Sequence, residues 1–221
     1  MKKNILLLIL TVFTVQLMAQ KKISVSESSE NIGNGKNNSL IVTIYESNTS
    51  DIEKEWKSIM KSYGAKVSSK KEIFADDATI KVLGPNTVDV YARAEDNKNG
   101  SIKFIVGFDL GGAFVSSSQH SAEYKEVKKI LHDFAVKMSK EAVESQMKDA
   151  EKQQKKNEKD FESLVKDKSS LEKDIENYKS KIKSAEEDIQ KNLKEQEAKK
   201  KEVEAQKVVI SNLDKKAKAI N

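Results

Sequence analysis

The sequence contains no cysteine, and this absence excludes both disulfide bonds and a thiol for lipid attachment. Pro85 is the only proline in 221 residues, and apolar residues make up 37% of the chain against 34% charged residues. Typical globular proteins have about 45 to 50% apolar and about 25% charged residues. The chain therefore cannot bury one large core, and we expect a small folded domain with an extended, solvated remainder.

Arginine is also nearly missing, since Arg93 is the only arginine among 40 basic residues. Lysine is a hydrated point charge without the planar fork with which arginine binds phosphates and base edges. The clustered arginines and stacking aromatic residues of nucleic-acid sites are both absent. The net charge of +5 therefore predicts no nucleic-acid partner.

Residues 1–19 have the pattern of a secretory signal peptide. Lys2 and Lys3 precede an apolar run from Ile5 to Val15, and we expect cleavage near Ala19. A membrane anchor is the alternative, but the apolar run is shorter than the roughly 20 residues that cross a bilayer. The sequence thus predicts a periplasmic or secreted protein with no integral membrane span after processing.

The next segment, residues 20–38, is rich in serine, asparagine and lysine, which predicts a flexible lead-in. Residues 40–45 are apolar and β-branched, as is typical of a buried strand. Ser50 and Glu53 have the spacing of a capping box, which predicts a helix that Gly64 ends as a left-handed cap. One face of this helix carries Ile52, Trp56, Ile59 and Tyr63.

From Ala65 the pattern has a period of two, which predicts four strands at residues 65–73, 78–83, 87–94 and 101–110. The expected turns are Asp76-Asp77, Gly84-Pro85-Asn86 and residues 96–100. Short connections of this kind predict an antiparallel meander with one face covered and the other in water. The cover would be the Ser50 helix and a helix after Ser121 whose apolar stripe is Val127, Leu131, Phe134 and Met138.

These elements define the expected fold class, which is α+β. We predict a small antiparallel sheet domain of order β-α-β-β-β-β-α over residues 39–145, followed by a long C-terminal coiled coil. A polar helical spacer over residues 146–160 would join the two, because no glycine or proline follows Gly112.

A heptad pattern of apolar residues begins at Phe161 and predicts a coiled coil over residues 161–221. Its a positions include Phe161, Ile175, Ile182, Ile189, Val203 and Ile210, and its d positions include Leu164, Leu171, Tyr178 and Leu213. Polar residues interrupt the seam between Asn192 and Lys200, which we expect to be its weakest part.

Charges beside this seam predict a parallel homodimer. In a parallel pair, each g residue faces the e residue of the partner's next heptad. Only Asp167 with Glu172 repels, and the attractive pairs are Asp174 with Lys179, Lys181 with Glu186, Glu195 with Lys200 and Glu202 with Lys207. An isoleucine-rich a position leaves a trimer open, and a bend within residues 151–160 would instead give an intramolecular hairpin.

Residues able to carry catalysis are few, and we predict no catalytic residues, no metal and no cofactor. His132 lies off the apolar stripe of its helix, which favours an exposed side chain. The pairs Asp76-Asp77 and Asp96-Asn97 lack the ligand spacing of a calcium loop and are explained as turns.

Four residues remain as weak ligand-binding candidates: Gly111, Gly112, Ser118 and His120. Backbone amides at Gly111 and Gly112 would suit an anion, although paired glycines also mark tight turns. Ser118 and His120 would suit a nucleophile and its base, although serines before a helix usually cap it.

Three segments of the head are VTIYE at 42–46, KFIVGFDLGGAF at 103–114 and SSSQH at 116–120. They resemble parts of small secreted bacterial proteins that have an α+β head and a C-terminal coiled coil, and this resemblance implies no activity. The overall plan is also similar in outline to the Skp-type periplasmic holdase chaperones. In those proteins strands return after the helical hairpin, whereas nothing after residue 120 has a strand pattern here.

Taken together, the sequence predicts a non-enzymatic envelope protein whose coiled coil sets the oligomeric state and whose head contacts another envelope protein. A periplasmic holdase chaperone or assembly factor is the first alternative. A hydrolase or ligand-binding enzyme that uses residues 111–120 is the second.

Overall fold

The computed structural model describes residues 21–220 and shows a sheet of six strands followed by a long C-terminal helix. The predicted signal peptide, residues 1–19, lies outside the described residues. The chain divides into two units between Ala150 and Glu151. Among residues 21–220, no helix is long and apolar enough to cross a membrane.

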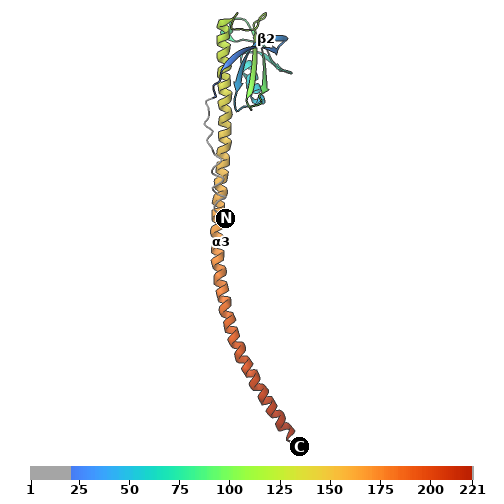
Figure 1. Cartoon of the computed structure of the whole chain (residues 1–221), viewed down its shortest axis with the longest axis vertical. Helices are drawn as coiled ribbons and strands as arrows, with labels where there is room; N and C mark the ends of the chain where they lie inside the picture. Colours follow the sequence, from blue (N-terminus) through green and yellow to red (C-terminus); the bar gives the residue numbers. More distant parts are fainter. Residues whose placement is uncertain (1–20, 221) are drawn as a thin grey trace. The chain divides into compact units, whose positions relative to one another are not determined.

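The first unit is built on an antiparallel sheet in the order β1-β2-β6-β5-β4-β3. One helix joins β2 to β3, and β6 returns to pair with β2 in the middle of the sheet. A single antiparallel sheet with two helices confirms the predicted α+β class. The strands are β1 (Val25–Ile32), β2 (Gly35–Ile44), β3 (Lys66–Ser69), β4 (Ile73–Ala78), β5 (Val88–Asp96) and β6 (Ile102–Asp109). Figure 1 shows this sheet beside the first turns of the long helix.

Two helices cover one face of the sheet, as predicted. α2 (Thr49–Ser62) connects β2 to β3 and buries Ile52, Trp56 and Met60. α3 (Ser121–Lys218) follows β6, and its first turns bury the predicted stripe of Val127, Leu131, Phe134 and Met138. These side chains share one core with the inward residues of the strands, among them Leu40, Val42, Val90 and Phe104.

The ends of α2 show one correction and one confirmation. Asn48 caps the helix in place of Ser50, because its side chain accepts a hydrogen bond from Asp51 N at 2.9 Å. The Asn48 amide also donates to the Asp51 carboxylate at 2.7 Å, so this pair closes the first turn from both sides. At the other end Gly64 has φ +82°, the left-handed conformation predicted for it.

Residues 25–38 are not a flexible lead-in, and this prediction was wrong. They form β1 and the start of β2, which pair from Val25↔Val42 to Ile32↔Gly35 and leave Gly33-Asn34 as a two-residue loop. Few side chains of β1 are apolar, so backbone hydrogen bonds to β2 order this strand. Burial of Val25 and Ile32 stabilises its two ends. The folded head therefore begins before residue 39.

The predicted turn at Asp76-Asp77 is also wrong, because both residues lie inside β4. The pairing of β4 with β5 shifts between Ala75 and Ala78, and Asp77 takes φ +59° at this irregularity. The turn occurs instead after the short strand β3, and residues 81–83 form a 3-10 helix in place of the predicted strand.

The second face of the sheet is partly covered, although we expected it to face water. The tip of the β1–β2 hairpin reaches over this face, where Gly33 N donates to the Glu72 carboxylate at 2.9 Å. Ile32 and Ile105 are buried there, outside the main core. Gly107 makes room for the hairpin, because a Cβ at this position would lie 2.9 Å from the Phe114 ring and 3.3 Å from Ile32 Cγ2.

The second unit, residues 151–221, is described as helix from Glu151 to Lys218. The segment 151–160 is helical throughout, which is the predicted spacer conformation rather than a bend. Within the described part of this unit there is no turn that an intramolecular hairpin requires. The trimer and the parallel dimer remain as arrangements of separate chains.

Candidate interaction surfaces

The seam of α3 within the second unit is an exposed apolar stripe. Its a and d side chains were the predicted oligomerisation residues, and each is more than half exposed in the single chain. The exposed fractions include 67% for Phe161, 63% for Leu171, 59% for Ile182 and 59% for Leu213. The same is true of Leu164, Ile175, Tyr178, Ile189, Val203 and Ile210. An exposed apolar stripe of this length is typical of a helix that packs against a second apolar surface.

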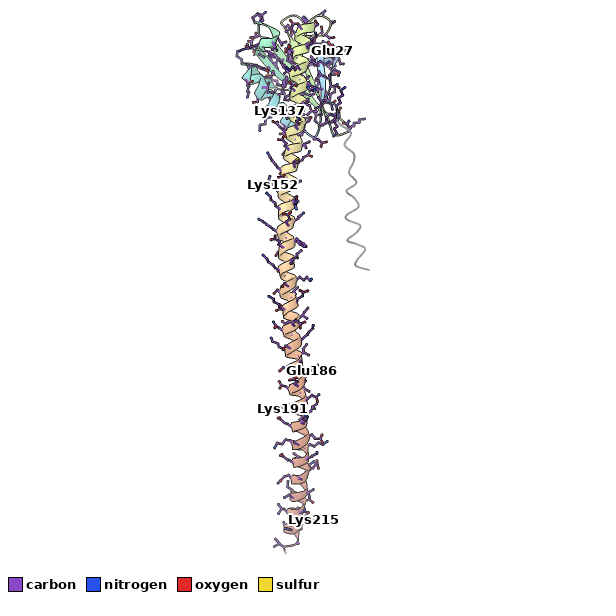
Figure 2. All side chains as sticks on the ribbon, turned by 90° about the vertical axis from the view of Figure 1, so that its left-hand side faces the viewer. Glu27, Lys137, Lys152, Glu186, Lys191 and Lys215 are labelled. Atoms are coloured by element: carbon purple, nitrogen blue, oxygen red, sulfur yellow. The ribbon has the colours of Figure 1, made fainter. Side chains whose placement is uncertain are left out.

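Charged residues surround this stripe. Figure 2 shows charged side chains on both sides of the helix, among them the labelled Lys152, Glu186 and Lys191. Several form ion pairs three or four residues apart, such as Lys179 with Glu176 at 2.7 Å. Pairs of this kind support the helix by about 0.2 to 0.5 kcal/mol each, so they stabilise the helix but do not cover its apolar face.

The amides of Gly111 and Gly112 are not free for an anion. Both donate to Asp109 Oδ1, at 2.9 Å and 3.3 Å. A carboxylate of the chain itself therefore occupies the position that a bound anion would need. The paired glycines make a tight turn after β6, which is the second of the two interpretations that the sequence allowed.

Ser118 and His120 are close in sequence, but no hydrogen bond joins them within the described chain. The Ser118 hydroxyl lies 3.4 Å from the Ser116 hydroxyl, which itself accepts from Gln119 N at 3.2 Å. His120 Nδ1 is buried without a hydrogen-bond partner among the described residues. Ser116 therefore closes the turn over residues 117–119 and does not cap α3, which begins at Ser121. The candidate nucleophile and base are not engaged with each other.

Three aspartates converge on the face of β4 and β5. Their carboxylate oxygens, from Asp76, Asp77 and Asp89, all lie within 4.8 Å of one another. Asp77 N donates to Asp89 Oδ1 at 3.1 Å, and Thr87 donates to the Asp77 carboxylate at 2.8 Å. The sequence identified the first two aspartates but not Asp89, because only the pairing of β4 with β5 brings it close.

An aromatic stack continues from these aspartates on the same face of the sheet. The rings of Phe74 and Tyr91 are stacked with centroids 4.8 Å apart, and the Phe114 ring lies 6.0 Å from that of Tyr91. All three side chains are half-buried. Burial raises the pKa of Tyr91, and the negative charges of Asp89, Asp109, Glu72 and Asp76 raise it further. The three aromatic residues and four of the surrounding carboxylates form a surface that we call the aromatic–acidic face. Its members are Phe74, Tyr91, Phe114, Glu72, Asp76, Asp89 and Asp109.

A separate carboxylate, Glu27 on β1, ties the hairpin to the loop before α3. Its Oε1 atom accepts from the Asn38 amide at 2.7 Å and from Ser117 N at 3.0 Å. Burial raises the pKa of Glu27, but hydrogen bonds from Ser117 and Asn38 outweigh this effect, and Lys128 adds to them, so the pKa is lowered. Glu27 is labelled beside α3 in Figure 2. This contact is structural and holds the N-terminal strand in place.

An open cleft of about 1060 Å³ lies between residues 21–23, residues 45–46 and the first part of α3. Some of its polar groups pair with one another. Lys21 Nζ lies 2.6 Å from Glu46 Oε1, and Tyr45 N donates to the Ser139 hydroxyl at 3.0 Å. These contacts occupy part of the polar lining, and the remaining charged residues are Lys22, Lys140 and Glu144.

Comparison with known proteins adds no relative. No protein-family model matches the chain, and neither a curated protein nor a solved structure matches it. The function is therefore inferred from the surfaces alone.

Proposed function

We propose that this chain is a secreted or periplasmic interaction protein whose C-terminal helix pairs with a second copy, parallel and in register, and whose α+β head contacts another envelope protein. The exposed apolar stripe of α3 carries this proposal. Localisation rests on the signal-peptide pattern of residues 1–19.

Burial of the stripe supports association with another helix. Each large apolar side chain that moves from water into a packed seam contributes about 1.5 to 3 kcal/mol when fully buried. Ten a and d residues from Phe161 to Leu213 are more than half exposed, whereas association itself costs about 4 to 15 kcal/mol. The stripe is long enough to offset that cost with only part of its surface.

Charge complementarity supports a second copy of this chain as the occupant. In a parallel, in-register pair, the g-to-e contacts are attractive at Asp174 with Lys179, Lys181 with Glu186, Glu195 with Lys200 and Glu202 with Lys207. Exposed pairs contribute about 0.2 to 1 kcal/mol each, so they select orientation more than they add stability. The polar seam residues Asn192 and Gln196 act in the same direction, because polar side chains in a seam favour one register.

A cysteine crosslink tests this arrangement, and the natural chain has no competing thiol. Ile182 occupies an a position, where the two copies of a parallel pair lie at the same level across the seam. Ile182→Cys should therefore oxidise to a covalent dimer. Ser180→Cys is the matched control, because position f lies on the outer side of the same helical turn and should remain uncrosslinked.

Sedimentation of the reduced protein supplies the subunit count. A dimer or trimer with the crosslink only at Ile182→Cys supports the parallel assembly. A dimer without that crosslink would mean antiparallel or staggered helices, and a monomer would contradict self-association. A monomer that prevents an unfolded client from aggregating would instead support the holdase alternative.

A further inference from the structure

We propose that the aromatic–acidic face is the docking surface of the head, and that its partner is a lysine- or arginine-rich segment of another protein. This inference rests on the proposed function, since it names the surface and the partner chemistry for the head of an interaction protein. The face comprises Phe74, Tyr91 and Phe114 together with Glu72, Asp76, Asp89 and Asp109.

The face is built from three separate segments of the chain, residues 72–76, 89–91 and 109–114. Phe74 and Asp76 come from β4, Tyr91 and Asp89 from β5, and Asp109 from the end of β6. The remaining members, Glu72 and Phe114, come from the turn before β4 and the loop after β6. Neither α2 nor α3 covers this side of the sheet, because their buried residues belong to the core on the opposite side.

The carboxylates on this face lack cationic partners. Within residues 21–220, none of Glu72, Asp76, Asp89 and Asp109 forms an ion pair with a lysine or arginine. On the same side of the sheet, Arg93 lies 2.7 Å from Glu95 and Lys103 lies 2.9 Å from Glu30. Lys66 lies opposite Asp76 in the pairing of β3 with β4, but the two form no ion pair in the described part of the chain. A cluster of negative charge therefore remains in a chain whose net charge is +5.

The combination of rings and carboxylates fits a basic segment. A lysine or arginine side chain can place its apolar stem on an aromatic ring and its charge against the ring face or a carboxylate. The stacked rings of Phe74 and Tyr91 provide such a platform, and Asp76 and Asp89 border it. Like charges held close together also attract a basic partner from a distance, which raises the association rate.

The test uses the mature full-length protein and a fluorescein-labelled peptide of alternating lysine and glycine, measured by fluorescence anisotropy. The double variant Asp76→Asn, Asp89→Asn keeps the side-chain shapes but removes two charges. We expect it to bind the peptide about 2- to 30-fold more weakly, which is the range for losing two exposed ion pairs. The matched control, Glu53→Gln with Glu126→Gln, removes the same charge from the two helices and should leave binding unchanged.

Two further measurements make the result specific. Tyr91→Leu keeps an apolar side chain without the aromatic ring and should weaken binding by about 2- to 5-fold. The affinity of the unmodified protein should fall when the ionic strength rises from about 0.01 M to about 0.1 M, because the screening length shortens from about 30 Å to about 10 Å. Thermal unfolding of each variant shows that the head remains folded.

Three outcomes overturn this inference. The first is no binding of the peptide by the unmodified protein, and the second is an equal loss in the aspartate and the helix variants, which would reflect net charge alone. The third is calorimetric calcium binding, lost in the aspartate variant, without peptide binding. None of these outcomes affects the crosslink at Ile182→Cys, so failure of the docking surface and failure of the coiled-coil assembly can be told apart.

Discussion

Replacing Trp56 with alanine should be among the most damaging single changes in the head. The side chain is 0% exposed and lies at the centre of the core. Its ring meets Phe104 edge-on at 5.2 Å and Phe134 at 5.0 Å. Truncating a buried tryptophan to alanine costs about 3 to 5 kcal/mol, because the lost contacts leave a cavity that the surroundings fill only in part.

Trp56→Phe should be milder, because phenylalanine keeps part of the aromatic packing of this side chain. The indole Nε1 is buried and has no hydrogen-bond partner among the described residues. An unsatisfied buried N–H costs about 1 to 3 kcal/mol, and phenylalanine removes it while keeping one aromatic ring. We therefore expect Trp56→Phe to cost about 0 to 2 kcal/mol, well below the alanine variant.

Unfolding of the head by denaturant, followed in the full chain, measures both variants. Near-ultraviolet circular dichroism should be the signal, because the far-ultraviolet signal of the full chain is dominated by its 98-residue helix. A loss below about 1 kcal/mol for Trp56→Ala would refute the central place of this side chain in the core. Equal losses for alanine and phenylalanine would show that the retained ring of phenylalanine restores none of the lost packing.

Two further predictions concern the N-terminal hairpin. A fragment of residues 21–150 should melt cooperatively in calorimetry. A fragment of residues 36–150 should melt at a lower temperature, because it lacks β1 and the buried Val25 and Ile32. Equal melting temperatures would show that β1 does not stabilise the head. Glu27 has a pKa below its ordinary value of 4.5, so its contribution is present at neutral pH and lost as pH falls through the lowered pKa. Glu27→Gln should therefore lower stability at pH 7 and flatten its dependence on acid, and an unchanged acid profile would contradict this role.

Local patterns were sufficient for the helices and for two strands. The spacing of Trp56 and Ile52 identified the buried face of α2, and Gly64 was recognised as its cap. The regular alternation in β5 and β6 placed both strands within two residues of their observed bounds. These elements are readable because neighbours within one turn or one strand determine them.

The hairpin β1–β2 and the bulge in β4 were not predicted. β1 is a polar strand whose stability comes from hydrogen bonds to β2, so its own composition resembles that of a flexible segment. The loop Gly33-Asn34 was the available signal, since a glycine–asparagine pair between two segments is typical of a hairpin. Asp76 and Asp77 resemble a turn in sequence, but pairing with β5 holds them within a strand.

A small α+β head before a long helix with an apolar heptad stripe could be predicted from residue patterns, because both follow from short-range periodicity. The surfaces that the head presents depend on tertiary contacts. In the folded head, Asp109 Oδ1 accepts hydrogen bonds from the Gly111 and Gly112 amides. Asp76, Asp89 and Tyr91 lie together on one face of the sheet. The approach of Asp76 to Asp89 depends on how β4 pairs with β5, which the residue pattern of either strand alone does not determine.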